Sequence, residues 1–170
     1  ECGVEKMAKI DFSPDSARRL LHPKLTVLVT SSDDEGNSNI ITLAWVMPVS
    51  ADPPLAAISV GFGRYSHDLI SDYGDFVINI PDSGLLEEVN FCGSRSGTEV
   101  EKFKDTGLTP EESKEVKAPR IKECSASIEC RLEDSMDAGD HTIFVGRIVA
   151  SSVDEDVFDF ESKSYDPDRF

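Results

Sequence analysis

Arg95 and Lys102 flank a glycine- and serine-rich stretch of an acidic chain, within residues 91–103 of sequence F-C-G-S-R-S-G-T-E-V-E-K-F. Such a turn can present free main-chain N–H groups, and the two cations would add charge-assisted hydrogen-bond donors. Thr98 and Glu101 form a capping-box pattern, which predicts a helix that begins here and places the turn at its N-terminus. The combination suits one phosphate group. The alternative is an ordinary helix start whose charged side chains all face water.

The usual nucleotide-binding fingerprints are not found in the sequence. The segment G-S-R-S-G-T lacks the Gly-Lys-Ser/Thr ending of a P-loop, and no G-x-G-x-x-G occurs. A nucleotide-hydrolysing enzyme or a Rossmann enzyme is therefore disfavoured.

Charge and hydropathy exclude several other classes of protein. The 170 residues include 33 Asp and Glu against 17 Lys and Arg, a net charge of -16, which disfavours binding to nucleic acid or to a membrane surface. No apolar run approaches the roughly 20 residues of a membrane span, and no signal peptide is evident. The four cysteines form no C-x-x-C pair and the three histidines are scattered, so we expect no metal site. We expect one cytoplasmic domain over residues 1–170.

Hydrophobic periodicity predicts a mainly β protein with short helices. A helix is expected from Ser13 to about Leu21, and a second, capped by Ser66, ends at Gly74. Short helices and loops are expected over 82–119. Strands are expected over residues 25–31, 39–46, 55–61, 76–81, 123–132 and 141–149, with a loop over 48–54.

Two of these strands carry further information. In residues 123–132 every even position is apolar and every odd one is polar, which predicts one buried and one solvated face. The segment 141–149 is apolar on both faces and contains Gly146, which suggests a bulge or bend. Six or seven such strands favour a closed or nearly closed barrel.

Four segments taken in order resemble a known family. Residues 39–54, 59–70, 91–103 and 139–149 look like the flavin reductase-like, FMN-binding split-barrel proteins, which include flavoredoxins and an archaeal ferric reductase. The resemblance covers roughly residues 20–155. It implies a Greek-key-like split β-barrel with peripheral helices, assembled as a homodimer that binds FMN non-covalently. Relatives usually continue beyond the position of Tyr165, so we expect the C-terminal end to be incomplete.

The resemblance also assigns positions around the cofactor. Residues 42–45 match the strand along the flavin ring, and residues 59–66 match the turn around the ring and ribityl chain. The phosphate-binding turn is matched by Arg95, Ser96, Gly97 and Lys102. Trp45 stands where relatives often have a small hydroxyl residue. The implied cofactor-binding residues are Asn39, Thr42, Leu43, Ala44, Trp45, Ser59, Val60, Gly61, Phe62, Gly63, Arg64, Tyr65, Ser66, Asn79, Arg95, Ser96, Gly97, Lys102 and Phe103.

The chemistry implied by the resemblance is electron transfer from NAD(P)H through FMN to free flavin, a ferric chelate or a partner protein. His141 matches a histidine near the reductant site, although a histidine at a strand start is usually a hydrogen-bonded structural residue. Cys92 is either a redox thiol or, more commonly for such a residue, a buried free cysteine. Two alternatives stay open: a flavoredoxin-type carrier without nicotinamide activity, and a non-catalytic FMN-binding module.

Overall fold

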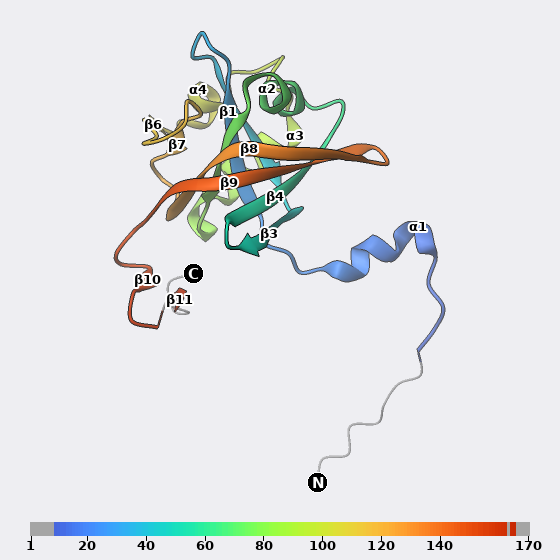
Figure 1. Ribbon diagram of the computed structural model, residues 1–170. Helices are drawn as coiled ribbons and strands as arrows, with labels where there is room; N and C mark the ends of the chain where they lie inside the picture. The colour runs from blue at the N-terminus through green and yellow to red at the C-terminus, as the bar shows by residue number, and fades with distance from the viewer. Residues whose placement is uncertain (1–8, 163, 166–170) are drawn as a thin grey trace.

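The structure is a computed structural model that describes residues 9–162 and 164–165. Its main feature is a seven-stranded antiparallel sheet in the order β2-β1-β5-β8-β9-β4-β3, which curls into a barrel (Figure 1). The prediction of a mainly β protein is confirmed. The strands of this sheet are β1 (Val27–Ser32), β2 (Ser38–Leu43), β3 (Val46–Ala51), β4 (Pro54–Gly61), β5 (Asp75–Ile80), β8 (Ala126–Ala138) and β9 (His141–Val153).

The remaining elements are short and lie around the barrel. Two small two-stranded sheets pair β6 (Pro110–Glu111) with β7 (Arg120–Ile121) and β10 (Phe158–Asp159) with β11 (Ser164–Tyr165). The helices are α1 (Pro14–Ala17), η1 (Arg18–Leu21), α2 (Tyr65–Tyr73), η2 (Ser83–Leu85), α3 (Leu86–Ser94) and α4 (Lys102–Thr106). The arm that carries α1 extends away from the barrel (Figure 1). In the part of the chain that is described, no helix is long and apolar enough to cross a membrane.

The barrel has two hydrophobic clusters, one on each face of the sheet. Val27 and Phe76 belong to the cluster inside the barrel, whereas Leu28 and Cys92 belong to a cluster beneath α3. Phe76 approaches Gly146 so closely that a Cβ on that glycine would lie 2.6 Å from its ring. Gly146 therefore serves close packing. The ladder between β8 and β9 does shift register opposite Gly146, with the extra residue on β8.

The expected loop over 48–54 is wrong. The chain breaks earlier, at Ala44 and Trp45, and then forms β3, which includes Pro48 and pairs with β4 through an irregular register. Proline lacks an N–H group, so it is tolerated only where no ladder bond is needed. β3 is an edge strand, and it can therefore accommodate Pro48.

The helix expected after residue 66 exists, but its start differs. Arg64 is the N-cap residue and makes no side-chain capping bond, while Ser66 lies inside the helix and accepts a hydrogen bond from the Asn39 amide at 2.8 Å. Gly74 ends the helix with φ of +74°, as predicted.

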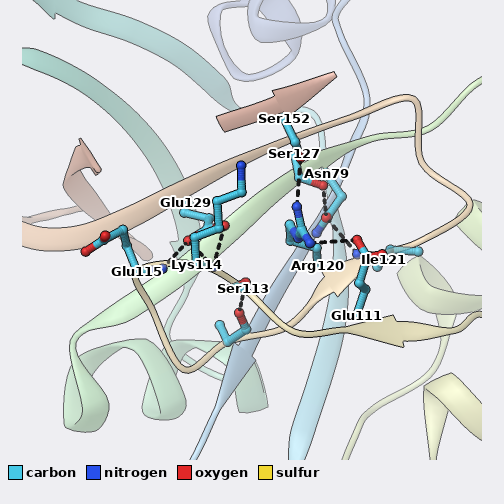
Figure 2. A network of polar contacts seen from close by, with 11 residues as sticks. Asn79, Glu111, Ser113, Lys114, Glu115, Arg120, Ile121, Ser127, Glu129 and Ser152 are labelled. Atoms are coloured by element: carbon cyan, nitrogen blue, oxygen red, sulfur yellow. Dashed lines mark hydrogen bonds and ion pairs between the residues drawn. The ribbon is translucent and has the colours of Figure 1, made fainter. Parts of the chain in front are cut away.

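The predicted solvated face of residues 123–132 is wrong at its centre (Figure 2). Ser127 and Glu129 are 4% and 1% exposed because the segment between β6 and β7 covers them. The Glu129 carboxylate accepts hydrogen bonds from the main-chain N–H groups of Lys114 and Glu115, at 3.0 and 2.8 Å. The Ser127 hydroxyl donates to Asn79 Oδ1 at 2.8 Å. The polar pattern reflects a buried network that distant main-chain groups satisfy.

Candidate functional site

A cavity of about 280 Å³ lies where β2, the end of β4, the start of α2 and the end of α3 converge. Thr42 donates a hydrogen bond to the Val89 carbonyl at 2.6 Å and so holds β2 against α3. The segments that the sequence singled out therefore meet in space. The lining consists of Asn39, Ile41, Thr42, Leu43, Ala44, Trp45, Ser59, Gly61, Gly63, Arg64, Tyr65, Ser66, Cys92, Gly93, Arg95, Ser96, Gly97, Lys102 and His141.

The electrostatics of this cavity oppose those of the whole chain. Arg64, Arg95 and Lys102 line it, and its lining contains no Asp or Glu, although the chain carries a net charge of -16. Within the described residues, neither arginine forms an ion pair with a carboxylate. The cavity thus holds uncompensated positive charge, which suits an anion.

The turn around Arg95 differs from the expected helix start. Arg95 is the C-cap of α3, and α4 begins only at Lys102, so the capping-box prediction at Thr98 is wrong. Ser96 instead organises the turn: its hydroxyl accepts a hydrogen bond from the Thr98 main-chain N–H at 3.3 Å. The turn and its cations therefore supply donors at this wall of the cavity, and the start of α2 lies at the wall as well.

Lys102 is only 4% exposed, and its ammonium is already engaged. It donates hydrogen bonds to the Ile40 carbonyl at 2.7 Å and to the Cys92 carbonyl at 2.8 Å. Burial lowers the pKa of Lys102, and the neighbouring Arg64 acts in the same direction. Lys102 therefore joins β2 to α3 and also places positive charge at the cavity wall. Arg95 is the freer of the two cations.

Gly97 brings main chain very close to the opposite wall. A Cβ at this position would lie 2.1 Å from Asn39 Oδ1 and 3.0 Å from Tyr65 Cδ1, so only glycine fits without a shift of these groups. The Asn39 amide donates to Ser66, which locks the start of α2 to β2. The end of the cavity beside Gly97 is consequently tight and preorganised.

At the other end of the cavity, His141 lies against Trp45, with ring centroids 4.6 Å apart. His141 pairs with Gly61 across the β4–β9 ladder, and its Nε2 atom lies 3.6 Å from where a Gly61 Cβ would be. Its Nδ1 atom is 2.6 Å from Asp140 Oδ1, and this contact lowers the pKa of Asp140. Because Nδ1 is engaged, Nε2 is the ring nitrogen left for a ligand.

Four predicted residues lie outside the cavity lining. Val60 is fully buried in the barrel, Phe62 packs edge-on against His67, and Phe103 packs beneath the sheet beside Leu108. Asn79 is also fully buried, and its amide is committed to the network of Figure 2.

The lining also contains residues that the cofactor prediction omitted, namely Ile41, Cys92 and Gly93. Gly93 lies close to Thr42: a Cβ at this position would lie 3.2 Å from the Thr42 side chain, and glycine permits that approach. Burial raises the pKa of the Cys92 thiol to about 11, which keeps it protonated near neutral pH. This supports a buried free cysteine rather than a redox thiol.

Cys124 and Cys130 are buried free thiols, as expected, but they belong to different hydrophobic clusters. No group of three or more potential metal ligands occurs in the described part of the chain.

Comparison with known proteins identifies what this arrangement resembles. The family model described as "Flavin reductase like domain" matches residues 18–166. A protein of Archaeoglobus fulgidus is 42% identical over 129 residues, which cover 76% of this chain and 72% of the relative.

Two solved structures share the fold over nearly the whole chain. The flavoredoxin of Desulfovibrio vulgaris (Miyazaki F) is 30% identical, with a TM-score of 0.82, and the match covers 94% of this chain and 84% of that one. An FMN-binding protein from Thermus thermophilus, with bound 1-cyclohex-2-enone, is 27% identical with a TM-score of 0.83, and the match covers 95% and 88%. The predicted split-barrel fold is confirmed.

Proposed function

The chain belongs to the family of flavin reductase-like domains, and from this premise we propose that it is an FMN-binding oxidoreductase. The electrons would come from NAD(P)H and pass to free flavin, a ferric chelate or a partner protein. The observation that carries this proposal is the cavity with three cations and no carboxylate in a chain of net charge -16.

The residues of this cavity fit FMN. Arg95, the hydroxyl of Ser96 and the N–H groups of the turn supply donors of the kind that a phosphate monoester requires, and Arg64 adds charge from the facing wall. The close approach at Gly97 leaves no room for a larger side chain at this end. Lys102 contributes its charge from behind the turn.

The ring of the cofactor would lie at the end formed by Ala44, Trp45, Ser59 and Gly61, where main chain and flat side chains dominate. Bound FMN supplies the redox chemistry, and the protein orients the ring and sets the charge around it. His141 is the titratable side chain at this end. Its free Nε2 could hold a proton or a polar group of the reductant beside the ring.

We further propose that the chain forms one domain that assembles as a cytoplasmic homodimer. On the edge strand β3, the Val49 side chain is 42% exposed, which suits contact with a second copy. A cavity of about 280 Å³ is small for a cofactor site, and a second subunit would complete its wall. The free thiols at Cys92, Cys124 and Cys130 suit a reducing compartment.

A second candidate is an electron carrier that takes electrons from another protein. It is favoured by the likeness to a flavoredoxin at 30% identity over 94% of the chain. The two candidates share the FMN site and differ in whether a nicotinamide reduces the bound flavin.

The visible absorption spectrum of the purified protein tests both. We expect a yellow protein that releases FMN on denaturation and bleaches with NADH or NADPH under anaerobic conditions. A protein that holds FMN but stays oxidised would favour the carrier. A colourless protein that takes up no added FMN would refute the flavin site.

A further inference from the structure

A second cavity, of about 550 Å³, lies beside the first and is far more apolar. The two share Ala44, Trp45 and Ser59, so the Trp45 segment forms the partition between them. Ala57 and Ile58, which are 3% and 1% exposed, form part of the second cavity's lining.

The mouth of this second cavity is lined by apolar side chains that face solvent. Leu21, Leu25 and Met47 are 68%, 51% and 57% exposed, and they come from two separate parts of the chain, the N-terminal arm and β3. An occupant of the cavity would remove all three from water, which favours binding by roughly 25 cal/mol for each Å² of apolar surface covered. The volume lies within the roughly 300–1,000 Å³ range of small-molecule sites.

Among the described residues, Arg18 and Lys24 are the charged ones that line the second cavity, and no Asp or Glu from this part of the chain lines it. Arg18 donates a hydrogen bond to the main-chain carbonyl of Asp15 at 2.7 Å, and its charge also acts on the Asp140 carboxylate, which does not line the cavity. The Lys24 ammonium lies 5.3 Å from the centroid of the Trp45 ring. Two cations in the lining of an apolar cavity, in so acidic a chain, favour an occupant that is itself anionic.

We propose that the second cavity binds a small aromatic carboxylate. Its ring lies among Trp45, Met47 and Ile143, and its carboxylate faces Arg18 and Lys24. A planar ring suits the indole face, and a carboxylate suits the guanidinium, with which it forms paired hydrogen bonds. Because Trp45 belongs to both cavities, this compound occupies a position next to the proposed flavin site. The binding itself requires no flavin.

Trp45 is the single tryptophan of the chain, so its fluorescence reports directly on the partition between the cavities. The full chain, free of flavin, is titrated with benzoate and with benzyl alcohol as the neutral counterpart, and calorimetry gives the two affinities independently. We expect saturable binding with benzoate favoured roughly tenfold or more, because only benzoate carries a negative charge and two oxygens that can pair with a guanidinium.

The double variant Arg18→Gln, Lys24→Gln is expected to lose this preference. Arg95→Gln is the matched control, because it removes a cation from the first cavity only, and it is expected to retain the preference. Loss of benzoate binding in Arg95→Gln would place the carboxylate in the first cavity and overturn the proposal. Equal affinity for the two compounds, or no saturable binding, would also overturn it.

Sedimentation of the same samples identifies a competing occupant. If Trp45 responds only when dilution separates a dimer, a second copy of the chain covers the cavity, and the proposal is wrong. FMN uptake without benzoate binding would refute this proposal alone. Benzoate binding without FMN uptake would refute the proposed function alone.

Discussion

The ammonium of Lys102 donates a hydrogen bond to the main-chain carbonyl of Cys92 at 2.8 Å, and it donates another to Ile40. The lysine at the cavity wall is therefore also a structural tie between β2 and α3. Its removal would take a donor away from two buried carbonyl groups, and the loss of a buried hydrogen bond is costly.

We predict that Lys102→Met lowers the free energy of unfolding by roughly 1–3 kcal/mol, because buried acceptors lose their donors. Chemical denaturation measures this loss. Lys104→Met is the matched control, since the Lys104 side chain is 78% exposed and pairs only with Glu101 at the surface. Equal stability of the Lys102→Met variant and the wild type would contradict the buried role.

Arg95 is predicted to bind the phosphate group of FMN without supporting the fold. Arg95→Gln should weaken FMN binding by roughly tenfold or more, the value of a charge-assisted hydrogen bond, and should leave riboflavin binding unchanged. Fluorescence titration with both flavins measures the difference. Arg131→Gln, which removes an exposed arginine paired with Glu115, controls for net charge. Equal losses for FMN and riboflavin would remove Arg95 from the phosphate site.

His141 is predicted to act on the reductant rather than on FMN affinity. We expect His141→Gln to slow the reduction of bound FMN by NADH or NADPH by roughly tenfold or more, in line with the loss of a positioned proton-bearing group. The FMN dissociation constant should stay the same. Stopped-flow absorbance under anaerobic conditions gives the rate, and an unchanged rate would leave His141 as a structural partner of Asp140 and Trp45.

Asn79 was predicted to bind the cofactor, but the structure buries it outside the cavity lining. The amide oxygen accepts hydrogen bonds from the Ile121 N–H at 3.0 Å and the Ser127 hydroxyl at 2.8 Å, well inside the protein. We predict that Asn79→Leu lowers the melting temperature by several degrees, since at least two buried donors lose their acceptor. FMN affinity of the protein that remains folded should not change. A selective loss of FMN binding would restore Asn79 to the cofactor site.

Local signals in the sequence predicted much of the fold, and the family resemblance predicted most of the cavity lining. Gly74 ends α2 in the left-handed conformation as its position indicated, and hydrophobic periodicity located six of the seven barrel strands but missed β3. The resemblance grouped the phosphate turn with residues 59–66, and the structure brings them together around one cavity. The helix end and the strands depend on residues that are close in sequence, and the grouping of the cavity residues depends on family motifs that occur in the same order.

The errors arise where distant parts of the chain decide the environment of a residue. Glu129 sits at a polar position of an alternating strand, and only the covering segment at Lys114 and Glu115 makes it buried. Pro48 reads as a strand breaker until β3 is known to lie at the edge of the sheet. From local sequence, Lys102 would be placed at the surface, because its carbonyl partner Ile40 lies 62 residues away in the chain. No local pattern encodes these contacts.

The buried thiol of Cys130 predicts how stability depends on alkaline pH. Burial raises its pKa from the ordinary value of 9.0 to about 12, and the neighbouring Glu129 carboxylate adds to the shift. Between these values the thiol is ionised in the unfolded chain but protonated in the folded one. The unfolded state then binds fewer protons, so stability is lost as pH rises above 9.0.

We therefore compare the wild type with Cys130→Ala by chemical denaturation at several pH values from neutral to strongly alkaline. The stability advantage of the wild type should be largest below the pKa of the unfolded thiol. Above it, the advantage should shrink by about 1.4 kcal/mol for each pH unit. Groups common to both proteins cancel in this difference. If the unfolding free energies of the two proteins change with pH in parallel, the thiol titrates alike in the folded and unfolded states. The Cys130 thiol would then not be buried in the folded protein.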